Sequence, residues 1–452
     1  MEWLQNVNRW VWGVPTLLLI LTVGVLLSAA TRFAQFRFLP KALRSFLKPG
    51  KDGDHCDGES PFRALCTALA ATVGTGNLVG VAGAISIGGP GAVFWIWVGG
   101  LLGMVTKFAE ATLAVHYRKK CAGGEYIGGP MYIITNAMPR STHFLAYIYA
   151  FFGVVAAFGV GNATQINTMI GGINSVLSYF DLNGSFYINL LFGLCMALLV
   201  CILFFGGAKR IGATAETLVP LGAVIYVLLG LGVFIARYDA IPGAFASILR
   251  GAISPKAVTG GMVGSAMITL RVGTSRGVFT NEAGMGTAGI AHAAAKVKHP
   301  VDQGMMGIVE VFIDTIVICT ITALVILCSG VSIIYGEDMG MNLTTDAFSS
   351  VYGGWVTILL AATLCLFAFA TVIGWGLYGV RCAQFLFGEG VWRKFAILQS
   401  LSVVLGAVLR AETVWLLADT VNGLMAIPNL IALIYLLPSI RLLVNDYGKG
   451  KD

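Results

Sequence analysis

Long apolar runs, separated by short breaks rich in charged residues, glycine or proline, follow one another along the whole chain. A run of about 18 or more residues with few charges is long enough to cross a hydrocarbon core of about 30 Å as a helix. The pattern predicts about eleven such helices. Their expected ranges are 10–30, 62–87, 92–116, 144–179, 186–205, 213–236, 257–295, 301–330, 352–387, 392–409 and 414–437. The fourth, seventh and ninth are too long for a straight crossing, so we expect a tilt, a break or an attached surface segment.

The composition agrees with a membrane protein. Hydrophobic residues make up 57% of the 452 residues and charged residues only 11%, which leaves more apolar surface than a soluble interior of this size can hide. The short alternating segments of a β-barrel are not seen. The sequence therefore predicts an all-α integral membrane protein in contact with the lipid bilayer.

Basic residues predict the orientation of the helices, because loops rich in Lys and Arg stay in the cytoplasm. They gather in every second loop: in residues 32–51, at Arg118, Lys119 and Lys120, at Lys209 and Arg210, at Lys296 and Lys298, and at Arg393 and Lys394. Arg410 and the loop with Arg237, Arg250 and Lys256 depart from the pattern without reversing it. We expect a multi-pass protein of the cell membrane with an external N-terminus and a cytoplasmic tail, residues 441–452. The net charge of +7 then reflects helix ends and does not indicate a nucleic-acid partner.

An odd number of helices suggests one leading helix followed by two blocks of five. Residues 1–61 hold the extra helix and a cytoplasmic loop, and the two blocks span 62–236 and 257–440. Because five is odd, the blocks have opposite orientations, which is the arrangement of inverted repeats around a site at the midplane.

Small residues interrupt the first helix of each block. The first interruption is Gly74-Thr75-Gly76-Asn77, and the second is expected at Arg271-Val272-Gly273-Thr274. A break in a membrane helix leaves carbonyls that suit a hard monovalent cation and amides that suit a carboxylate. The alternative is that the glycines only allow close helix packing.

Several motifs resemble those of the alanine or glycine:cation symporter family, of the sodium:alanine symporter type. They are Ala71 to Val81 around the first break, Gly88-Gly89-Pro90-Gly91 with Ala92 to Trp95, Gly128 to Tyr132, Arg276 to Gly286, and Ile373-Gly374-Trp375-Gly376. These matches extend from about residue 60 to 390. The resemblance implies a LeuT-type core of five-plus-five inverted repeats preceded by one extra helix, and coupled uptake of a small amino acid with sodium. It implies no catalytic residue, no organic cofactor and no metal other than sodium.

The resemblance also implies site residues. Those matching the family's substrate site are Thr75, Gly76, Asn77, Phe158, Gln165, an unwound stretch from Leu270 through Val272 and Gly273 to Thr274, and Trp375. Those matching a sodium site are Thr72, Val73, Gly76, Asn77 and Thr371. The family often carries Tyr-Gly-Glu-Arg after the tryptophan, whereas this chain has Val380 in place of the glutamate. No role of that glutamate is therefore carried over.

Three of these residues have a plainer interpretation. Gln165 lies in an apolar helix, where its amide needs either a substrate or an interhelical hydrogen bond. Trp375 could anchor the helix at the membrane surface, although the middle of a long apolar run favours a pocket wall. Thr371 could bond only to its own helix.

Charged residues inside apolar helices need partners. They are Lys107, Glu110, Glu216, Arg271, Arg276, Glu282, Glu310 and Asp314. Lys107 and Glu110, three apart, are expected to neutralise each other. Arg276 and Glu282 are expected to serve in a gate or scaffold. No membrane carboxylate beside the first break is identified as a proton acceptor.

The predicted function is import of a small neutral amino acid, alanine or glycine, in symport with sodium by alternating access. A proton-coupled carrier and glutamine as substrate remain alternatives. A channel would show a repeated filter or a ring of charges, and an enzyme would show a nucleophile with a base or a metal set. Neither pattern is found, and the sequence does not indicate an oligomeric state.

Overall fold

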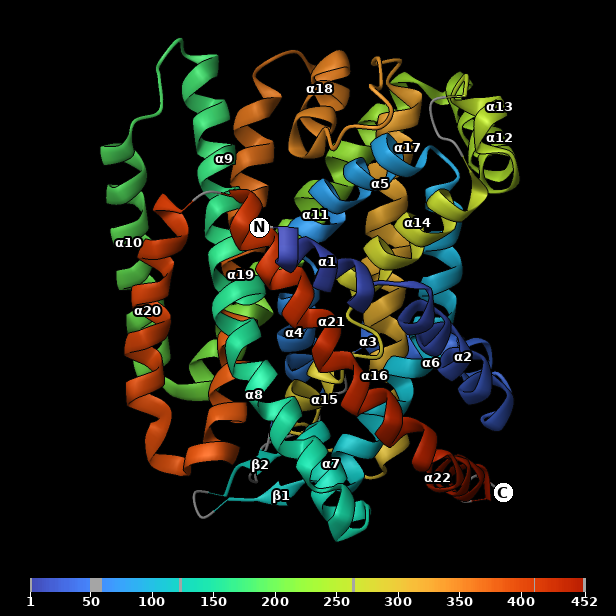
Figure 1. Cartoon of the computed structure of the whole chain (residues 1–452), viewed down its shortest axis with the longest axis vertical. Coiled ribbons are helices and arrows are strands. Elements are labelled where there is room, and N and C mark those ends of the chain that lie inside the picture. Colours follow the sequence, from blue (N-terminus) through green and yellow to red (C-terminus); the bar gives the residue numbers. More distant parts are fainter. Residues whose placement is uncertain (1, 49–58, 122–123, 262–264, 410, 450–452) are drawn as a thin grey trace.

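The computed structural model of the chain describes residues 2–48, 59–121, 124–261, 265–409 and 411–449, and it is almost entirely helical (Figure 1). The first half contains α1 (Glu2–Val11), α2 (Val14–Ala30), α3 (Ala34–Leu47), α4 (Pro61–Thr72), α5 (Val81–Gly88), α6 (Ala92–His116), α7 (Pro130–Ala137), α8 (Phe144–Phe158), α9 (Thr164–Tyr179), α10 (Phe186–Phe205) and α11 (Gly207–Ala236). The second half contains α12 (Ile241–Ile253), α13 (Pro255–Val258), α14 (Ala266–Asn281), α15 (Thr287–His292), α16 (Pro300–Val311), α17 (Thr320–Cys328), α18 (Gly340–Tyr352), α19 (Val356–Phe387), α20 (Trp392–Val408), α21 (Ala411–Tyr435) and α22 (Leu437–Lys449).

Short elements complete the described residues. Strands β1 (Lys119–Lys120) and β2 (Tyr126–Ile127) form an antiparallel hairpin. Wide π-helical turns occupy Gly76–Gly80, Gly159–Ala163 and Phe312–Cys319, and 3₁₀ turns occupy Arg140–Thr142, Tyr238–Ala240 and Glu389–Val391. The π turns matter for the site, because such turns free backbone carbonyls inside a helix.

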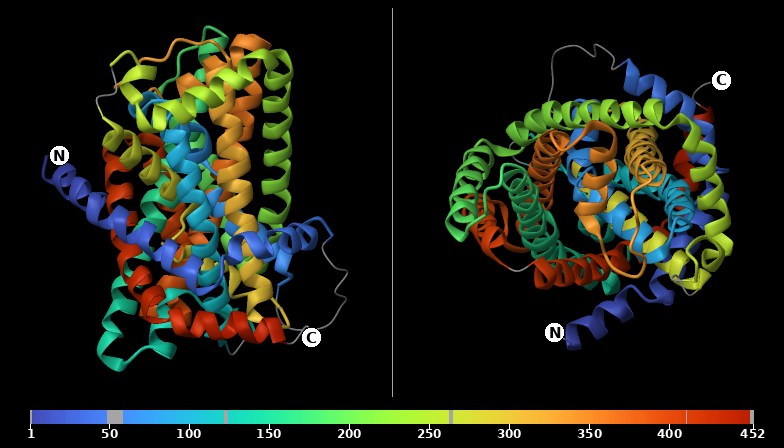
Figure 2. Two further views of the ribbon diagram at one scale, coloured as in Figure 1. Left: turned by 90° about the vertical axis from the view of Figure 1, so that its right-hand side faces the viewer. Right: turned by 90° about the horizontal axis from the view of Figure 1, so that it is seen from above.

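The all-α membrane architecture is as predicted. Eight helices of the described residues are long and apolar enough to cross a membrane, and up to ten are counted if each of two bent pairs is one span. Helix α1 projects from the side of the bundle (Figure 2). The number eleven and the division into blocks at 62–236 and 257–440 stay predictions.

The two broken helices behave differently from one another. The run 62–87 is α4 followed by a π turn and α5, bent by 50° between its halves, which matches the predicted first break. The predicted second break at Arg271 to Thr274 is wrong, since α14 continues as a regular helix to Asn281. The chain instead leaves the helix at Glu282 and resumes as α15 at Thr287. Figure 1 shows α4 and α5 rising through the bundle while α14 and α15 descend.

Close helix contacts surround these breaks. Helix α6 packs on α14 and α16, and α19 packs on α4, α8, α9 and α11. Seen from above, α5 lies inside a ring whose upper side in the picture is the long α11 (Figure 2). Glycine makes the approach possible: a Cβ on Gly161 would lie 2.1 Å from the Cβ of Trp375. The π turn at 159–163 is therefore pressed directly against α19.

Candidate functional site

Asn77 holds the first break together. Its Oδ1 accepts a hydrogen bond from the backbone N–H of Gly74 at 2.9 Å, and its own N–H donates to the Gly74 carbonyl at 3.3 Å. The Asn77 carbonyl accepts from the hydroxyl of Thr322 at 2.8 Å. Asn77 is fully buried. The break is thus an organised polar turn and not merely a place where glycines allow packing.

Two further predicted residues converge on Gly74. A Cβ on Gly74 would lie 2.7 Å from Oγ1 of Thr371 and 3.7 Å from Oε1 of Gln165. Thr371 donates to the Phe367 carbonyl at 3.0 Å, so its hydroxyl does bond back to its own helix, yet its lone pairs remain beside Gly74. Three elements distant in sequence, α4, α9 and α19, therefore meet at this glycine.

Several buried oxygens of the broken helices and of α9 lack a partner. Gln165 donates its Nε2 to the Val160 carbonyl at 3.1 Å, but its Oε1 has no hydrogen bond within the described part of the chain. The same holds for the hydroxyls of Thr75 and Thr274, both fully buried. Buried polar atoms are nearly always paired, so unpaired ones call for a ligand or water. All three were predicted as substrate contacts.

Three other predicted residues lie elsewhere. Val272 packs near Gly88, and a Cβ on Gly273 would lie 2.3 Å from the Ala92 carbonyl, so both face the turn between α5 and α6. Leu270 is on the same helical stretch of α14. The residue of α14 that reaches the first break is Thr280, whose Oγ1 would be 3.1 Å from a Cβ on Gly76. Thr280 was missed although it lies inside the recognised motif Arg276 to Gly286.

Buried carboxylates hold the second break. The backbone is left-handed at Glu282 (φ 55°), Gly284 (φ 93°) and Gly286 (φ 77°). Glycine adopts this conformation without a steric penalty, and it occupies two of the three positions. Oε1 of Glu110 accepts from the N–H groups of Gly284 and Gly286, both at 3.0 Å, and from Nδ2 of Asn429 at 2.8 Å. One of the five motifs that carry the family resemblance, Arg276 to Gly286, therefore contains the second break.

The expectation that Lys107 and Glu110 neutralise each other is wrong. Nζ of Lys107 lies 2.9 Å from Oε1 of Glu310 on α16, and both side chains are fully buried. The other oxygen of Glu310 lies 3.0 Å from Nε2 of His292 on α15. The pair thus joins α6, α15 and α16, while Glu110 is used at the second break.

Trp375 links α19 to the second break. Its indole N–H donates to Oε1 of Glu282 at 2.6 Å, and the hydroxyl of Thr287 donates to Oε2 at 2.6 Å. Trp375 is fully buried and is not an interfacial anchor. Glu282 thus accepts hydrogen bonds from α19 and α15, whereas Arg276 pairs with Asp338 at 3.3 Å in a partly exposed position. Phe158 is half-buried with its ring 5.2 Å from that of Phe395, and its role as a pocket wall stays a prediction.

A carboxylate does lie beside the first break, contrary to the sequence-based expectation. Nδ2 of Asn77 donates to Oδ1 of Asp314 at 2.8 Å and to the Asp314 carbonyl at 3.0 Å. Oδ2 accepts from the hydroxyl of Thr315 at 2.8 Å. Asp314 is fully buried and has no ion pair among the described residues. A buried carboxylate without a counter-charge favours a cation or a proton nearby.

The position that often carries glutamate in the family is apolar here. Val380 is fully buried. Its neighbour Arg381 pairs with Glu125, which precedes β2, at 3.0 Å and donates to Gln384 at 3.0 Å. The charge at this level of α19 is therefore balanced by the hairpin and not by a residue at position 380.

The comparisons with known proteins agree with the resemblance. Residues 1–452 match the model of the family described as the sodium:alanine symporter family. The sodium/alanine symporter AgcS of Methanococcus maripaludis is 40% identical over 96% of this chain and 94% of its own length. An uncharacterised transporter of Haemophilus influenzae is 40% identical over 98% and 95%. A probable sodium/glutamine symporter of Bacillus subtilis, GlnT, is 35% identical over 98% and 90%.

One solved structure supports the fold. The crystal structure of MhsT in complex with L-phenylalanine aligns with a TM-score of 0.59 at 14% identity, covering 86% of this chain and 99% of that one. This likeness confirms the predicted LeuT-type fold.

Proposed function

The chain belongs to the sodium:alanine symporter family and is a secondary amino-acid transporter, not an enzyme; on this premise we propose that it imports alanine or glycine together with sodium. The observation that carries the proposal is the set of uncharged, unpaired oxygens of Gln165, Thr75 and Thr274 close to the broken helices. Uncharged dipoles and helix ends suit a zwitterion, because its two charges are compensated without a fixed ion on the protein.

The amino acid would bind with its carboxylate toward the amides that begin the second half of the first broken helix, around Gly76 and Asn77. Its ammonium would donate to Oε1 of Gln165, which is buried and free to accept. Trp375 closes the region toward the second break through its bond to Glu282. Leu270, Val272 and Gly273 are less favoured as contacts, because two of them face the α5–α6 turn.

Sodium would bind beside Gly74, where the Thr371 hydroxyl approaches the break. The proposed ligands are oxygens of Thr72, Val73, Gly76, Asn77 and Thr371. Sodium prefers such hard, uncharged oxygens at an unwound segment. Coupling follows if sodium and amino acid both favour the same conformation of the first break.

A proton is the second candidate for the coupling ion, since Asp314 lies within hydrogen-bonding distance of Asn77. Glutamine is the second candidate for the substrate, since one relative is described as a probable glutamine symporter.

Radiolabelled uptake into proteoliposomes with an imposed sodium or proton gradient separates these candidates. We expect alanine uptake that follows the sodium gradient and is inhibited by glycine. Uptake that follows protons and ignores sodium would refute the coupling ion, and inhibition only by glutamine would refute the substrate.

Phe158→Ala is expected to broaden the accepted substrates, because an aromatic wall sets the volume of a small pocket. One methylene in such a pocket is worth about 1–3 kcal/mol, so discrimination against serine and valine should relax by about 10- to 200-fold and not vanish. Competition uptake measures the change. Trp375→Ala is expected to act similarly, but it also removes the hydrogen bond to Oε1 of Glu282, so Phe158 gives the cleaner test. Unchanged selectivity in a folded Phe158→Ala variant would place this residue outside the pocket.

We also propose that the protein lies in the cell membrane with its N-terminus outside and its C-terminus in the cytoplasm. Lys209→Cys and Arg210→Cys are then expected to resist a membrane-impermeant thiol reagent in intact cells and to react after permeabilisation. Labelling of both positions from outside would overturn the orientation drawn from the basic loops.

A further inference from the structure

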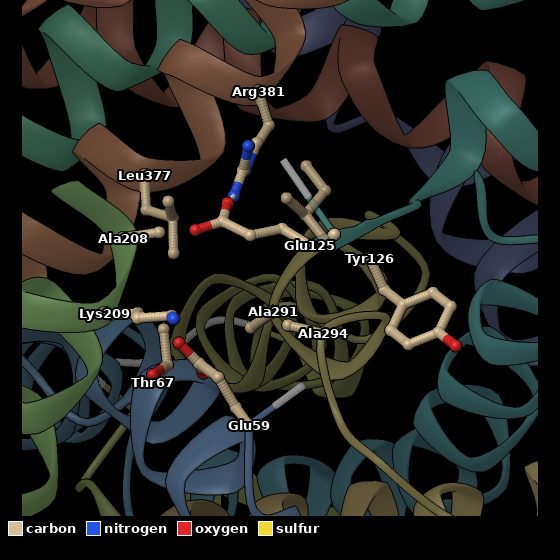
Figure 3. A pocket seen from close by; sticks show the side chains of 12 residues that line it. Glu59, Thr67, Glu125, Tyr126, Ala208, Lys209, Ala291, Ala294, Leu377 and Arg381 are labelled. Carbon is tan, nitrogen blue, oxygen red and sulfur yellow. Dashed lines mark hydrogen bonds and ion pairs between the residues drawn. The ribbon is translucent and has the colours of Figure 1, made fainter. Parts of the chain in front are cut away.

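A cavity with charges of both signs lies at the end of the molecule that carries the β1–β2 hairpin, the side predicted to be cytoplasmic. Four charged side chains line it: Glu59 before α4, Glu125 before β2, Lys209 on α11 and Arg381 on α19. Figure 3 shows them projecting into one space from four different parts of the chain. The cavity contains none of the residues proposed above for the central site.

Two of the four charges already compensate one another. Arg381 lies 3.0 Å from Glu125, and only a small part of the Arg381 side chain is exposed. Arg63, the first basic residue after Glu59 in the sequence, forms an ion pair with Glu216 at 2.7 Å. These pairs leave one carboxylate, Glu59, and one ammonium, Lys209, with no ion pair among the residues that the structure describes.

The unpaired carboxylate and ammonium are held in place on separate elements. The backbone of Glu59 pairs with the segment after α15. Its N–H donates to the Ala294 carbonyl at 3.0 Å, and its carbonyl accepts from the backbone N–H of Lys296 at 2.8 Å. Lys209 is in the first turn of α11. Figure 3 shows the ammonium of Lys209 and the carboxyl of Glu59 directed into the same part of the cavity, and the two form no ion pair with each other. One free charge of each sign matches a molecule that carries both.

We propose that this cavity is a second, weaker binding site for a zwitterionic amino acid, occupied from the cytoplasm. The ammonium of the amino acid donates to Glu59 and its carboxylate accepts from Lys209. The inference rests on the proposed function, because the amino acid that leaves the central site is the zwitterion concentrated here. Because Glu59 precedes α4 and its backbone pairs with the segment after α15, a ligand between Glu59 and Lys209 joins both segments to α11. This restrains the side from which substrate departs, so cytoplasmic amino acid slows the release of further substrate.

Protection of an introduced thiol tests the site. Ala294 lines the cavity and is half-buried, so Ala294→Cys in the purified full-length protein reports its occupation through the rate of alkylation. The central site is disabled with Gln165→Ala, and the measurement is made in potassium without sodium. Alanine is expected to slow alkylation, whereas propionate and propylamine, which each carry one of its charges, protect at least about tenfold more weakly.

Variants identify the two binding groups. Lys209→Met and Glu59→Gln are each expected to raise the half-protecting alanine concentration about tenfold or more. Arg210→Met is the matched control, because this neighbouring basic residue is exposed and does not line the cavity. Equal protection in Lys209→Met, Glu59→Gln and Arg210→Met would overturn the proposal, as would equal protection by propionate.

The pH dependence gives an independent readout. Burial raises the pKa of Glu59 to about 7, against the opposing charges of Arg63 and Arg381 and together with Glu125 and Glu216. Glu59 therefore becomes neutral as the pH falls through 7, and protection by alanine is expected to weaken between pH 8 and pH 6. In Glu59→Gln this pH dependence should disappear; its persistence would assign the protection to another group.

The proposed function and this inference fail in different ways. If wild-type protein transports alanine with sodium but the cavity variants leave protection unchanged, only the second site is refuted. If alanine is neither transported nor protective, the proposed substrate is refuted and the second site with it.

Discussion

Asn77→Ala is expected to reduce sodium-dependent uptake at least about 100-fold. The substitution removes the acceptor of the Gly74 N–H and the donor to Asp314, which leaves two buried polar groups without partners. An unsatisfied buried group costs about 1–3 kcal/mol, and two of them account for a loss of this size. Both groups lie at the break, so the geometry proposed to bind sodium and substrate is lost together.

The Thr371→Val variant tests the proposed cation site independently of the proposed substrate contacts. Valine keeps the shape of threonine but offers no oxygen to a cation beside Gly74. A bound cation stabilises the folded protein by RT ln(1 + [L]/Kd), so sodium should raise the melting temperature of the wild type in detergent relative to choline or potassium. We expect a smaller sodium effect in Thr371→Val and none in Asn77→Ala.

Thr363→Val is the matched control for Thr371→Val. Thr363 is a buried residue of the same helix and donates to the Leu359 carbonyl at 2.8 Å, as Thr371 donates to Phe367. The side chains nearest to a Cβ on Gly74 are those of Thr371 and Gln165, not that of Thr363. An equal loss of the sodium effect in both variants would show that the hydroxyl acts only within its helix. A full sodium effect in Asn77→Ala would exclude the first break as the cation site.

Lys107→Met is expected to destabilise the protein by about 3–5 kcal/mol, the largest effect on folding that we predict. The two charged groups are fully buried and 2.9 Å apart, so removal of the ammonium leaves the buried Glu310 carboxylate with His292 as its remaining partner. The monodisperse fraction after detergent extraction and the melting temperature report this loss.

Glu310→Gln introduced into Lys107→Met should restore most of the lost stability, because the double variant no longer buries an unpaired charge. Lys209→Met, which removes an exposed lysine, serves as the control and should leave stability nearly unchanged. A Lys107→Met protein as stable as the wild type, or no recovery in the double variant, would contradict the charge-pair explanation.

The sequence alone determined the features that depend on the solvent and on local backbone chemistry. Apolar runs must be helices in lipid, because every backbone group has to be bonded within its own segment. The break at Gly74 to Asn77 was visible for the same reason: small residues and a polar amide interrupt an otherwise apolar helix. The motifs from Ala71 to Gly376 then indicated the family, and the match over residues 1–452 confirmed it.

Tertiary structure decided which polar groups meet. The second break was misplaced at Arg271 to Thr274, because the small residues there serve close packing on the α5–α6 turn, while the break at Glu282 to Gly286 is stabilised by Glu110 from another helix. Lys107 likewise pairs with Glu310 and not with Glu110, which is closer to it in the sequence.

Asp314 shows most directly why the sequence could not predict these contacts. It lies 237 positions from Asn77 in sequence, yet their side chains are 2.8 Å apart. In a bilayer each buried charge or amide pairs with whatever group the packing of helices brings within hydrogen-bonding distance, and sequence separation carries no information about that distance. The sequence thus determined the broken helix at Gly74 to Asn77, where a site is proposed, and only the packing of α4, α9, the π turn at 312–319 and α19 decided which side chains lie beside it.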